Sequence, residues 1–292
     1  MTALSAFEEI TKTNEPLAPY TALKLGGPAD YLVQPRSIEE LASVVKTCHQ
    51  ESIPFRMMGG GCNILIGDDG VRGAVLRLSE PVFSEIKVDG RQVRAGAGAS
   101  LSSVISEAAR HSLAGLESLI GIRGTLGGAL LSNAGERINE ISQYVRGVET
   151  LDAQGQTHQR SGDEVRFGGG LSALEDPILL TVELELESED AEQIVKRMRK
   201  AWIVRKANRP YTYQASGRIF QNPKGLNAAT LIEQVDLVGT RVGGVEVSDR
   251  DANFFIVHDG ASSRDVHRLI DLIQTKVREQ FQVELELEIT LW

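Results

Sequence analysis

Three glycine-rich segments in the first half of the chain constrain its fold most. They are Leu-Gly-Gly-Pro-Ala at 25–29, Gly-Gly-Gly-Cys-Asn at 59–63 and Gly-Ile-Arg-Gly-Thr-Leu-Gly-Gly at 121–128, each beside an expected strand. Because glycine lacks a Cβ, such turns can direct backbone N–H groups at an anion and let a diphosphate approach closely. For any one segment a simple tight turn is an equal explanation. Three segments in one region favour a bound dinucleotide.

The two common nucleotide-binding fingerprints are missing. No Gly-x-x-x-x-Gly-Lys-Ser/Thr occurs, and no glycine trio opens a helix after the first strand with an acidic residue about 20 positions later. We therefore reject a P-loop or Rossmann assignment.

The hydrophobic pattern predicts a mixture of helices and strands without regular alternation, which is typical of an α+β protein. Helices are expected at 37–50, where Leu41, Val44, Val45 and Cys48 recur at helical spacing, and at 101–111. Two more are expected at 189–207, with the apolar stripe Ile194, Val195, Met198 and Trp202, and around the shared face Val266, Leu269, Ile270, Ile273 and Val277. Strands are expected at 53–58, 84–98 with a hairpin at Asp89-Gly90, 149–160, 178–188 and 283–292.

Composition and charge exclude several classes of function. The formal net charge is -9 without a basic stripe, which argues against a nucleic-acid partner. No segment has the length of apolar sequence that a membrane span requires, and the N-terminus lacks a signal-peptide pattern, so we expect a cytoplasmic protein. Two cysteines, Cys48 and Cys62, cannot build a disulfide framework or a multi-cysteine metal site. We expect no metal.

A change in composition near Ser188 predicts a domain boundary. Residues 1–188 would form one domain with two lobes, roughly 1–75 and 76–188, and residues 189–292 a second domain. The basic helix at 189–207 would link the two.

Motifs along nearly the whole chain resemble the UDP-N-acetylenolpyruvoylglucosamine reductase family. They are Thr-Ala-Leu-Lys-Leu-Gly-Gly-Pro-Ala-Asp at 21–30, the glycine segments at 59–66 and 121–130 with Asn-Ala-Gly at 133–135, and the C-terminal stretches 217–223, 229–232, 241–248 and 253–254. The resemblance implies a vanillyl-alcohol-oxidase-type FAD-binding fold in 1–188, a C-terminal α/β substrate domain in 189–292 and a monomer.

The same resemblance implies a flavoenzyme. NADPH would reduce FAD, which would then reduce the enolpyruvyl ether of a UDP-sugar. The residues implied to bind FAD are Gly59, Gly60, Gly61, Cys62, Asn63, Gly121, Gly124, Thr125, Gly127 and Gly128. Lys206 and Asn222 match positions implied to bind the substrate. A solvated basic face is the alternative explanation of Lys206.

The family's catalytic set is an arginine, a serine and a glutamate, and only the glutamate position matches. Glu288 occupies it near the C-terminus. By strand alternation Glu284 and Glu286 would share its face, so a solvated acidic edge is the competing interpretation.

The other two catalytic positions depart from the family pattern. Arg218 stands where the family has its proton-donating serine, and Gly169 and Gly170 stand where it has a tyrosine–arginine pair, with Arg166 nearby. Arg218 could bind the substrate carboxylate in a bidentate way. Because a guanidinium is a poor proton donor, the acid would be Ser216, Tyr211, Tyr213 or a water molecule.

Three functions remain open from the sequence. The first is the cell-wall reductase with an altered acid. The second is an FAD-dependent oxidoreductase of the same fold with a different substrate, which the changes at Arg218 and at Gly169 and Gly170 favour. The third is a catalytically impaired flavin-binding homologue, against which the three glycine motifs argue.

Overall fold

The computed structural model describes residues 4–136, 139–162, 164–165, 167–168, 171–172, 178–210 and 215–292. The α-helices are α1 (Ile38–Gln50), α2 (Leu101–Arg110), α3 (Leu126–Leu131), α4 (Ala191–Asn208), α5 (Ala228–Gln234) and α6 (Ser263–Phe281). The 3-10 helices are η1 (Ser5–Ile10), η2 (Ala18–Tyr20), η3 (Pro81–Phe83), η4 (Glu117–Leu119) and η5 (Ile141–Tyr144).

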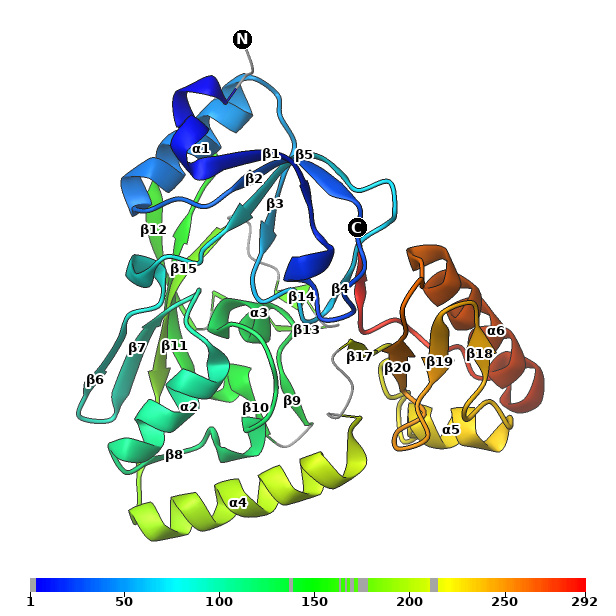
Figure 1. Cartoon of the computed structure of the whole chain (residues 1–292). Helices are drawn as coiled ribbons and strands as arrows, with labels where there is room; N and C mark the ends of the chain where they lie inside the picture. The colour runs from blue at the N-terminus through cyan, green and yellow to red at the C-terminus, as the bar shows by residue number, and fades with distance from the viewer. Residues whose placement is uncertain are drawn as a thin grey trace. The chain divides into compact units, whose positions relative to one another are not determined.

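Strands occur along the whole chain (Figure 1). They are β1 (Thr11–Pro16), β2 (Pro28–Val33), β3 (Phe55–Met58), β4 (Ile64–Leu65), β5 (Val71–Arg77), β6 (Ile86–Asp89), β7 (Gln92–Gly96), β8 (Leu113–Ala114), β9 (Gly135–Glu136), β10 (Asn139–Glu140), β11 (Val145–Leu151), β12 (Thr157–Ser161), β13 (Phe167–Gly168), β14 (Leu171–Ser172), β15 (Ile178–Glu185), β16 (Glu187–Ser188), β17 (Ser216–Arg218), β18 (Arg241–Val242), β19 (Val245–Val247), β20 (Phe254–Val257) and β21 (Thr290–Leu291).

The chain forms two compact units. The first contains Met1–Asn14, Asp30–Gly60 and Arg72–Ile203, and the second contains Glu15–Ala29, Gly61–Val71 and Val204–Trp292. Residues 189–203 thus group with the first unit, so the two compact units do not correspond to a single division of the chain after Ser188. The assignment of FAD binding to 1–188 and of substrate binding to 189–292 concerns ligands, and it stays a prediction.

The first unit contains a four-stranded sheet in the order β1-β2-β5-β3. Helix α1 begins at the N-cap Ser37, whose side chain accepts the Glu40 N–H. The predicted apolar face of this helix is confirmed, because Leu41, Val44, Val45 and Cys48 are buried with residues of this sheet.

A second, antiparallel sheet of the first unit has the order β12-β11-β15-β7-β6. The predicted hairpin is confirmed: β6 and β7 flank Gly90, whose φ is 56°. Helices α2 and α3 share the core of this sheet. Gly96 and Gly98 lie directly against the carbonyl oxygens of Phe83 and Leu78, so any Cβ there would collide with backbone. This close approach explains the alternating glycines after β7.

Helix α4 packs differently from the prediction. Ile194 is buried, but Val195 and Trp202 are 38% and 41% exposed, so the predicted apolar stripe does not form one core face. Instead, Arg197 reaches Glu117 with Nε–Oε1 and Nη2–Oε1 distances of 3.1 and 2.6 Å. A paired charge thus takes the place of part of the expected apolar contact.

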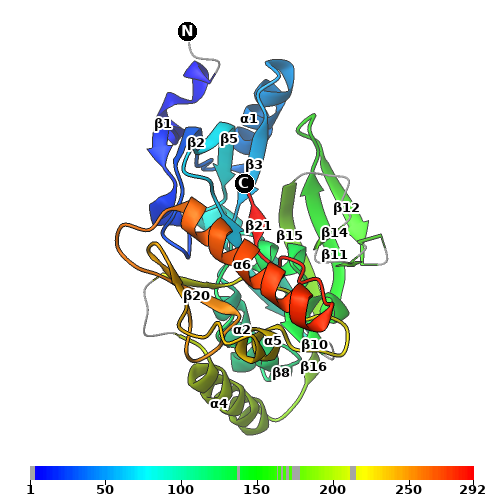
Figure 2. The same ribbon diagram turned by 90° about the vertical axis from the view of Figure 1, so that its right-hand side faces the viewer.

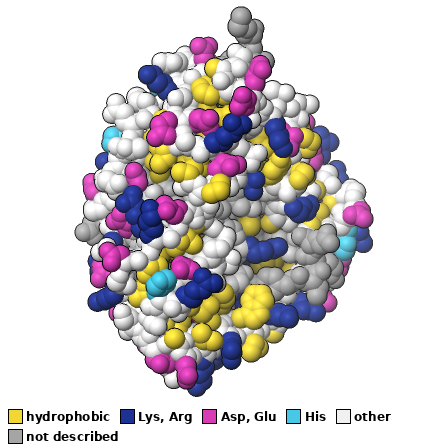
Figure 3. Space-filling model, turned by 60° about the vertical axis from the view of Figure 1, so that its left-hand side comes forward, with side chains coloured by type: hydrophobic (Ala, Val, Ile, Leu, Met, Phe, Trp, Pro, Cys, Tyr) yellow, Lys and Arg dark blue, Asp and Glu magenta, His cyan; other side chains and the backbone are white. Residues whose placement is uncertain are grey.

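Acidic and basic side chains lie intermixed on the face shown in Figure 3.

The second unit contains the antiparallel sheet β17-β20-β19-β18, beside which α5 and α6 lie (Figure 1). Figure 2 shows α5, α6 and β20 from another side. Ser262 and Asp265 form a capping box at the start of α6. The predicted apolar face of α6 is confirmed, because Val266, Leu269, Ile270, Ile273 and Val277 are buried in the core of this unit. Among the described residues, no helix is long and apolar enough to cross a membrane.

The prediction of a strand over 283–292 was wrong. Only Thr290–Leu291 is a strand, which pairs in parallel with β4. Residues 286–289 instead follow the chain after β17: Gln221 N–H donates to the Glu286 carbonyl, and Glu288 N–H donates to the Ile219 carbonyl at 2.8 Å. The alternating Leu and Glu residues therefore do not form one continuous strand. Residues 286–289 bond to the chain after β17, whereas Thr290–Leu291 pairs with β4.

Asn253 fixes the turn that follows β17. Its side chain is 2% exposed, accepts the Phe220 N–H at 2.8 Å and donates to the Phe220 carbonyl at 2.7 Å. Both peptide groups of Phe220 would lose their partner without it.

We expect Asn253→Ala to lower the free energy of unfolding by about 2–4 kcal/mol, because two buried backbone groups lose their hydrogen bonds. Urea unfolding followed by circular dichroism measures this. Gln280→Ala removes one exposed side chain with a single hydrogen bond and should change stability by less than about 0.5 kcal/mol. Equal effects of the two variants would contradict this role of Asn253.

Candidate active site

In the first unit, two of the glycine segments meet at Thr125. A Cβ on Gly59 would lie 2.5 Å from Thr125 Oγ1, and a Cβ on Gly128 would lie 3.4 Å from the same atom. The Thr125 hydroxyl is also the N-cap of α3, where it accepts the Gly128 N–H at 3.2 Å. The structure thus brings three of the predicted FAD-binding residues together at a surface with little side chain.

The N–H groups at the start of α3 are already bonded within the protein. Leu126 N–H donates to Ala99, and Gly127 N–H donates to the Ala97 carbonyl, each at 2.8 Å. The sequence suggested that Gly127 and Gly128 offer N–H donors to a diphosphate. In the structure the Gly127 N–H donates to Ala97 and the Gly128 N–H donates to Thr125, so both donors already have partners within the chain. A Cβ on Gly127 would lie 2.9 Å from the Ala97 Cβ, whereas Gly128 is exposed.

Three other glycines of these segments adopt positive φ, which L-residues with a side chain rarely do. Gly121 and Gly124 have φ of 80° and 125°, and the Gly124 carbonyl accepts the Leu101 N–H at 3.0 Å. Gly61 has φ of 62° and lies directly against the Tyr20 carbonyl oxygen. Each glycine is required by the backbone itself.

In the second unit, Asn63 connects the middle glycine segment to the C-terminal segment. Its side-chain amide donates to the Glu288 carbonyl at 2.9 Å, and its own carbonyl accepts the Thr290 N–H at 2.9 Å. Since β4 begins at the next residue and pairs with β21, Glu288 is held beside the end of a glycine-rich loop. Cys62, before Asn63, is half-buried.

Arg218 and Glu288 form an ion pair in the same unit. The Arg218 Nε–Glu288 Oε2 distance is 3.2 Å, and the side chains are 29% and 37% exposed. Glu284 and Glu286 are exposed, whereas Glu288 is partly buried and paired with Arg218, which argues against the competing interpretation of a solvated acidic edge for Glu288. Ser216 lies two residues before Arg218 on β17, on the same side of the strand, and is 2% exposed.

The surroundings of this ion pair raise the pKa values of two carboxyl groups, Glu288 and Asp251. Burial raises the pKa of Glu288, Arg218 and Arg209 lower it, and Asp251 raises it further. Burial likewise raises the pKa of Asp251, against the Asn253 N–H and the same two arginines. Glu288 is therefore easier to protonate than an exposed glutamate, which suits a group that gives a proton to substrate.

Two residues of this cluster were missed from the sequence. The Arg209 guanidinium carbon lies 5.4 Å from the centre of the Phe254 ring, a cation–π geometry. Asp251 lies in the turn before β20 and accepts the Asn253 N–H at 3.0 Å. A single arginine before a proline, and an aspartate in a polar turn, have no periodicity that indicates a site.

The remaining predicted residues lie as follows. Lys206 is exposed near the end of α4. Asn222 is exposed, and its side-chain carbonyl accepts the Ala228 N–H at 3.0 Å at the start of α5. Tyr211, Tyr213, Arg166, Gly169 and Gly170 lie outside the described residues.

Comparisons with known proteins identify the family of this chain. A family model described as "FAD binding domain" matches residues 29–161, and one described as "UDP-N-acetylenolpyruvoylglucosamine reductase, C-terminal domain" matches residues 209–292. The reductase so named from Clostridium botulinum is 35% identical over 98% of this chain and 95% of its own length. That from Caldanaerobacter subterraneus subsp. tengcongensis is 39% identical over 95% and 92%. The chain belongs to the UDP-N-acetylenolpyruvoylglucosamine reductase family.

The crystal structure of the reductase from Thermus caldophilus matches with a TM-score of 0.82, at 34% identity over 97% of this chain and 98% of that one. The predicted α+β class with a vanillyl-alcohol-oxidase-type FAD-binding fold is confirmed by this similarity and by the FAD-binding family model.

The residues of the first unit fit the FAD of this reductase family. Gly128 is exposed at the start of α3, and a Cβ there would have only ordinary contact with Thr125, so a flat or charged group can approach its backbone. Gly59, by contrast, packs against the Thr125 hydroxyl.

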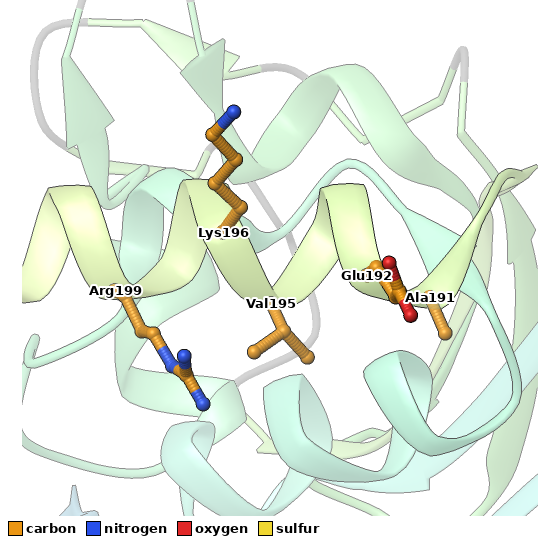
Figure 4. Close-up of a pocket in the computed structure, with 5 residues that line it drawn as sticks. All are labelled: Ala191, Glu192, Val195, Lys196 and Arg199. Atoms are coloured by element: carbon orange, nitrogen blue, oxygen red, sulfur yellow. The ribbon is translucent and has the colours of Figure 1, made fainter.

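A cavity of about 440 Å³ lies elsewhere in the first unit, along α4. Figure 4 shows its lining, with Lys196 directed away from Val195 and Arg199. None of its lining residues belongs to the set that the reductase family implies.

We expect Gly128→Ala to weaken FAD binding by about tenfold or more while leaving the fold intact. The new methyl group would protrude from the exposed start of α3 and would have ordinary contact only with Thr125. Gly127→Ala, by contrast, should lower the melting temperature, because its Cβ would collide with Ala97. Flavin-fluorescence titration and thermal melting of the apoprotein separate the two effects. Unchanged FAD affinity in Gly128→Ala would contradict a cofactor surface at α3.

The raised pKa of Glu288 predicts a pH-dependent stability. Its ionisation is harder in the folded than in the unfolded chain, so its contribution is favourable below its usual pKa and is lost as pH rises through the raised value. The stability of Glu288→Gln relative to the parent should therefore improve as the pH rises above the usual glutamate pKa of about 4. Urea unfolding across this range measures the difference. The exposed Glu286→Gln should give a flat profile, and a flat profile for Glu288→Gln would disprove the shift.

Proposed function

We propose that this chain is the NADPH-dependent flavoenzyme that reduces UDP-N-acetylglucosamine enolpyruvate to UDP-N-acetylmuramate for peptidoglycan synthesis. The observation that carries the proposal is the 35–39% identity to enzymes named UDP-N-acetylenolpyruvoylglucosamine reductase over nearly the whole chain. The Arg218–Glu288 pair supports it, because the reaction needs both a cation and an acid.

FAD, reduced by NADPH, supplies the hydride when it is bound. The glycine surface around Thr125 would hold the cofactor, together with Gly60, Gly61, Cys62 and Asn63. Residues 1–188 would serve FAD and residues 189–292 the substrate.

The residues of the second unit account for the remaining chemistry. Hydride addition to C3 of the enolpyruvyl group leaves negative charge at C2 and on the carboxylate. Arg218 can bind that carboxylate in a bidentate way and stabilise the growing charge. Glu288, whose pKa is raised by burial, can hold the proton that C2 requires. Ser216 is buried on the same side of β17 and would help to position the proton.

Lys206 would bind the substrate diphosphate, and Asn222 would belong to the same binding site. Lys206 carries a charge at the exposed end of α4, and the Asn222 amide still has N–H groups to donate while its oxygen caps α5. We further propose that the protein works as a cytoplasmic monomer.

A second candidate is an FAD-dependent oxidoreductase of the same family that acts on a different substrate. Arg218 in place of the family's serine favours it, because a guanidinium changes both the charge and the acid at the reacting atoms.

Arg218→Ala should lower the rate of flavin reoxidation by enolpyruvyl UDP-N-acetylglucosamine by about a hundredfold to a thousandfold, because one preorganised charge is removed. Flavin reduction by NADPH should change little. Anaerobic stopped-flow absorbance measures both steps. Arg278→Ala, on the exposed side of α6, is the matched control and should behave as the parent. If the reduced parent enzyme is not reoxidised by this substrate, the different-substrate proposal takes its place.

A further inference from the structure

Four charged side chains gather at one end of the sheet in the second unit. They are Arg209 after α4, Arg218 on β17, Asp251 in the turn before β20 and Glu288 near the C-terminus. Arg218 and Phe254 are direct partners across β17 and β20, so their side chains lie on the same face. The Arg209 guanidinium lies over that same Phe254 ring, 5.4 Å from its centre. Both guanidiniums therefore lie on one side of the sheet.

The charges of this cluster balance before any ligand arrives. Two arginines face two carboxyl groups, and Arg218 already binds Glu288 at 3.2 Å. A carboxylate that binds Arg218 through Nε and an Nη group competes with Glu288 for this guanidinium. The Arg218–Glu288 ion pair must open before a ligand is bound in that bidentate way.

We propose that a substrate carboxylate displaces Glu288 from Arg218, and that Glu288 takes up a proton from solvent as it is released. This inference rests on the proposed function, since it assigns the carboxylate to the enolpyruvyl group of that substrate. It explains how an acid forms at the site where Arg218 stands in place of a serine.

The surroundings of Glu288 favour its protonation once its carboxylate separates from Arg218. Its side chain is about two-thirds buried, and it is held in place by two backbone hydrogen bonds, from its N–H to Ile219 and from Asn63 to its carbonyl. These bonds fix the backbone of Glu288, so the carboxyl group stays within side-chain reach of Asp251 and the two arginines. Once Arg218 turns to the ligand, Glu288 keeps the repulsion of Asp251 and loses its main counter-charge.

Arg209 supplies a second positive charge for the ligand carboxylate when Arg218 separates from Glu288. The Phe254 ring fixes its guanidinium, so that a second cation is present when Arg218 changes partner. A ligand carboxylate would then face two guanidiniums, and the released Glu288 would be neutral.

The proton balance closes over one turnover. Glu288 takes one proton from solvent on binding and gives it to C2 after the hydride reaches C3. The C3–H and C2–H bonds form while the C2–C3 double bond is consumed. Glu288 returns to its carboxylate form and pairs again with Arg218 when the product leaves.

The test is isothermal titration calorimetry of the FAD-loaded oxidised protein in two buffers of different ionisation enthalpy, near pH 7. The ligands are UDP-N-acetylmuramate, which carries the carboxylate, and UDP-N-acetylglucosamine, which lacks it. We expect uptake of up to one proton per bound UDP-N-acetylmuramate and none with UDP-N-acetylglucosamine. Equal proton uptake with the two ligands, when both bind, overturns the exchange while leaving the reductase function intact.

Variants assign the proton to its residue. Glu288→Gln should abolish the carboxylate-dependent uptake, and Asp251→Asn should reduce it, because a neutral neighbour no longer disfavours ionised Glu288. Glu286→Gln, exposed two residues away, should retain the parent uptake. Uptake that persists in Glu288→Gln overturns the proposal. Failure of the parent to bind either nucleotide sugar would instead count against the reductase function itself.

Discussion

The backbone hydrogen bonds on either side of Glu288 hold the candidate catalytic group in place. Its N–H donates to Ile219, just beyond β17, and its carbonyl accepts from Asn63 at the end of a glycine-rich loop. Three segments far apart in the sequence thereby meet at one residue. This placement brings Glu288 into the ion pair with Arg218 and close to Asp251 and Arg209. The two hydrogen bonds matter because residues 283–289 are not part of a regular strand that would hold Glu288 in position.

Close approach of backbone has a similar part in the first unit. Gly59 lies against Thr125, Gly127 against Ala97, and Gly96 against Phe83. In each case a methyl group would collide with another part of the chain. The glycines thus bring loops together first, and the exposed surface around Gly128 results from that packing. The N–H groups at the start of α3 already donate to Ala99, Ala97 and Thr125 within the chain.

Electrostatics connects the departures from the family pattern. The family resemblance predicts a serine at the position of Arg218, and the structure places Arg218 against Glu288, the proposed catalytic residue that matches the family pattern. A guanidinium cannot replace a hydroxyl as an acid, but it can control the protonation of a neighbouring carboxyl group. Arg209 and Asp251 complete a balanced cluster, so a single substitution is accommodated by residues on three other segments.

The sequence by itself determined the local elements and the family. Local periodicity predicts the buried faces of α1 and α6, and turn chemistry predicts the hairpin at Gly90. The glycine motifs and their order are read directly from the sequence. None of these inferences requires contacts between distant residues. Only the tertiary structure decided that 283–289 is not a strand, that Val195 and Trp202 of α4 are exposed, and that Arg209 and Asp251 join Arg218 and Glu288. The reason is that pairing partners, burial and the charge around a carboxyl group depend on residues far apart in the chain, whose approach no local pattern encodes.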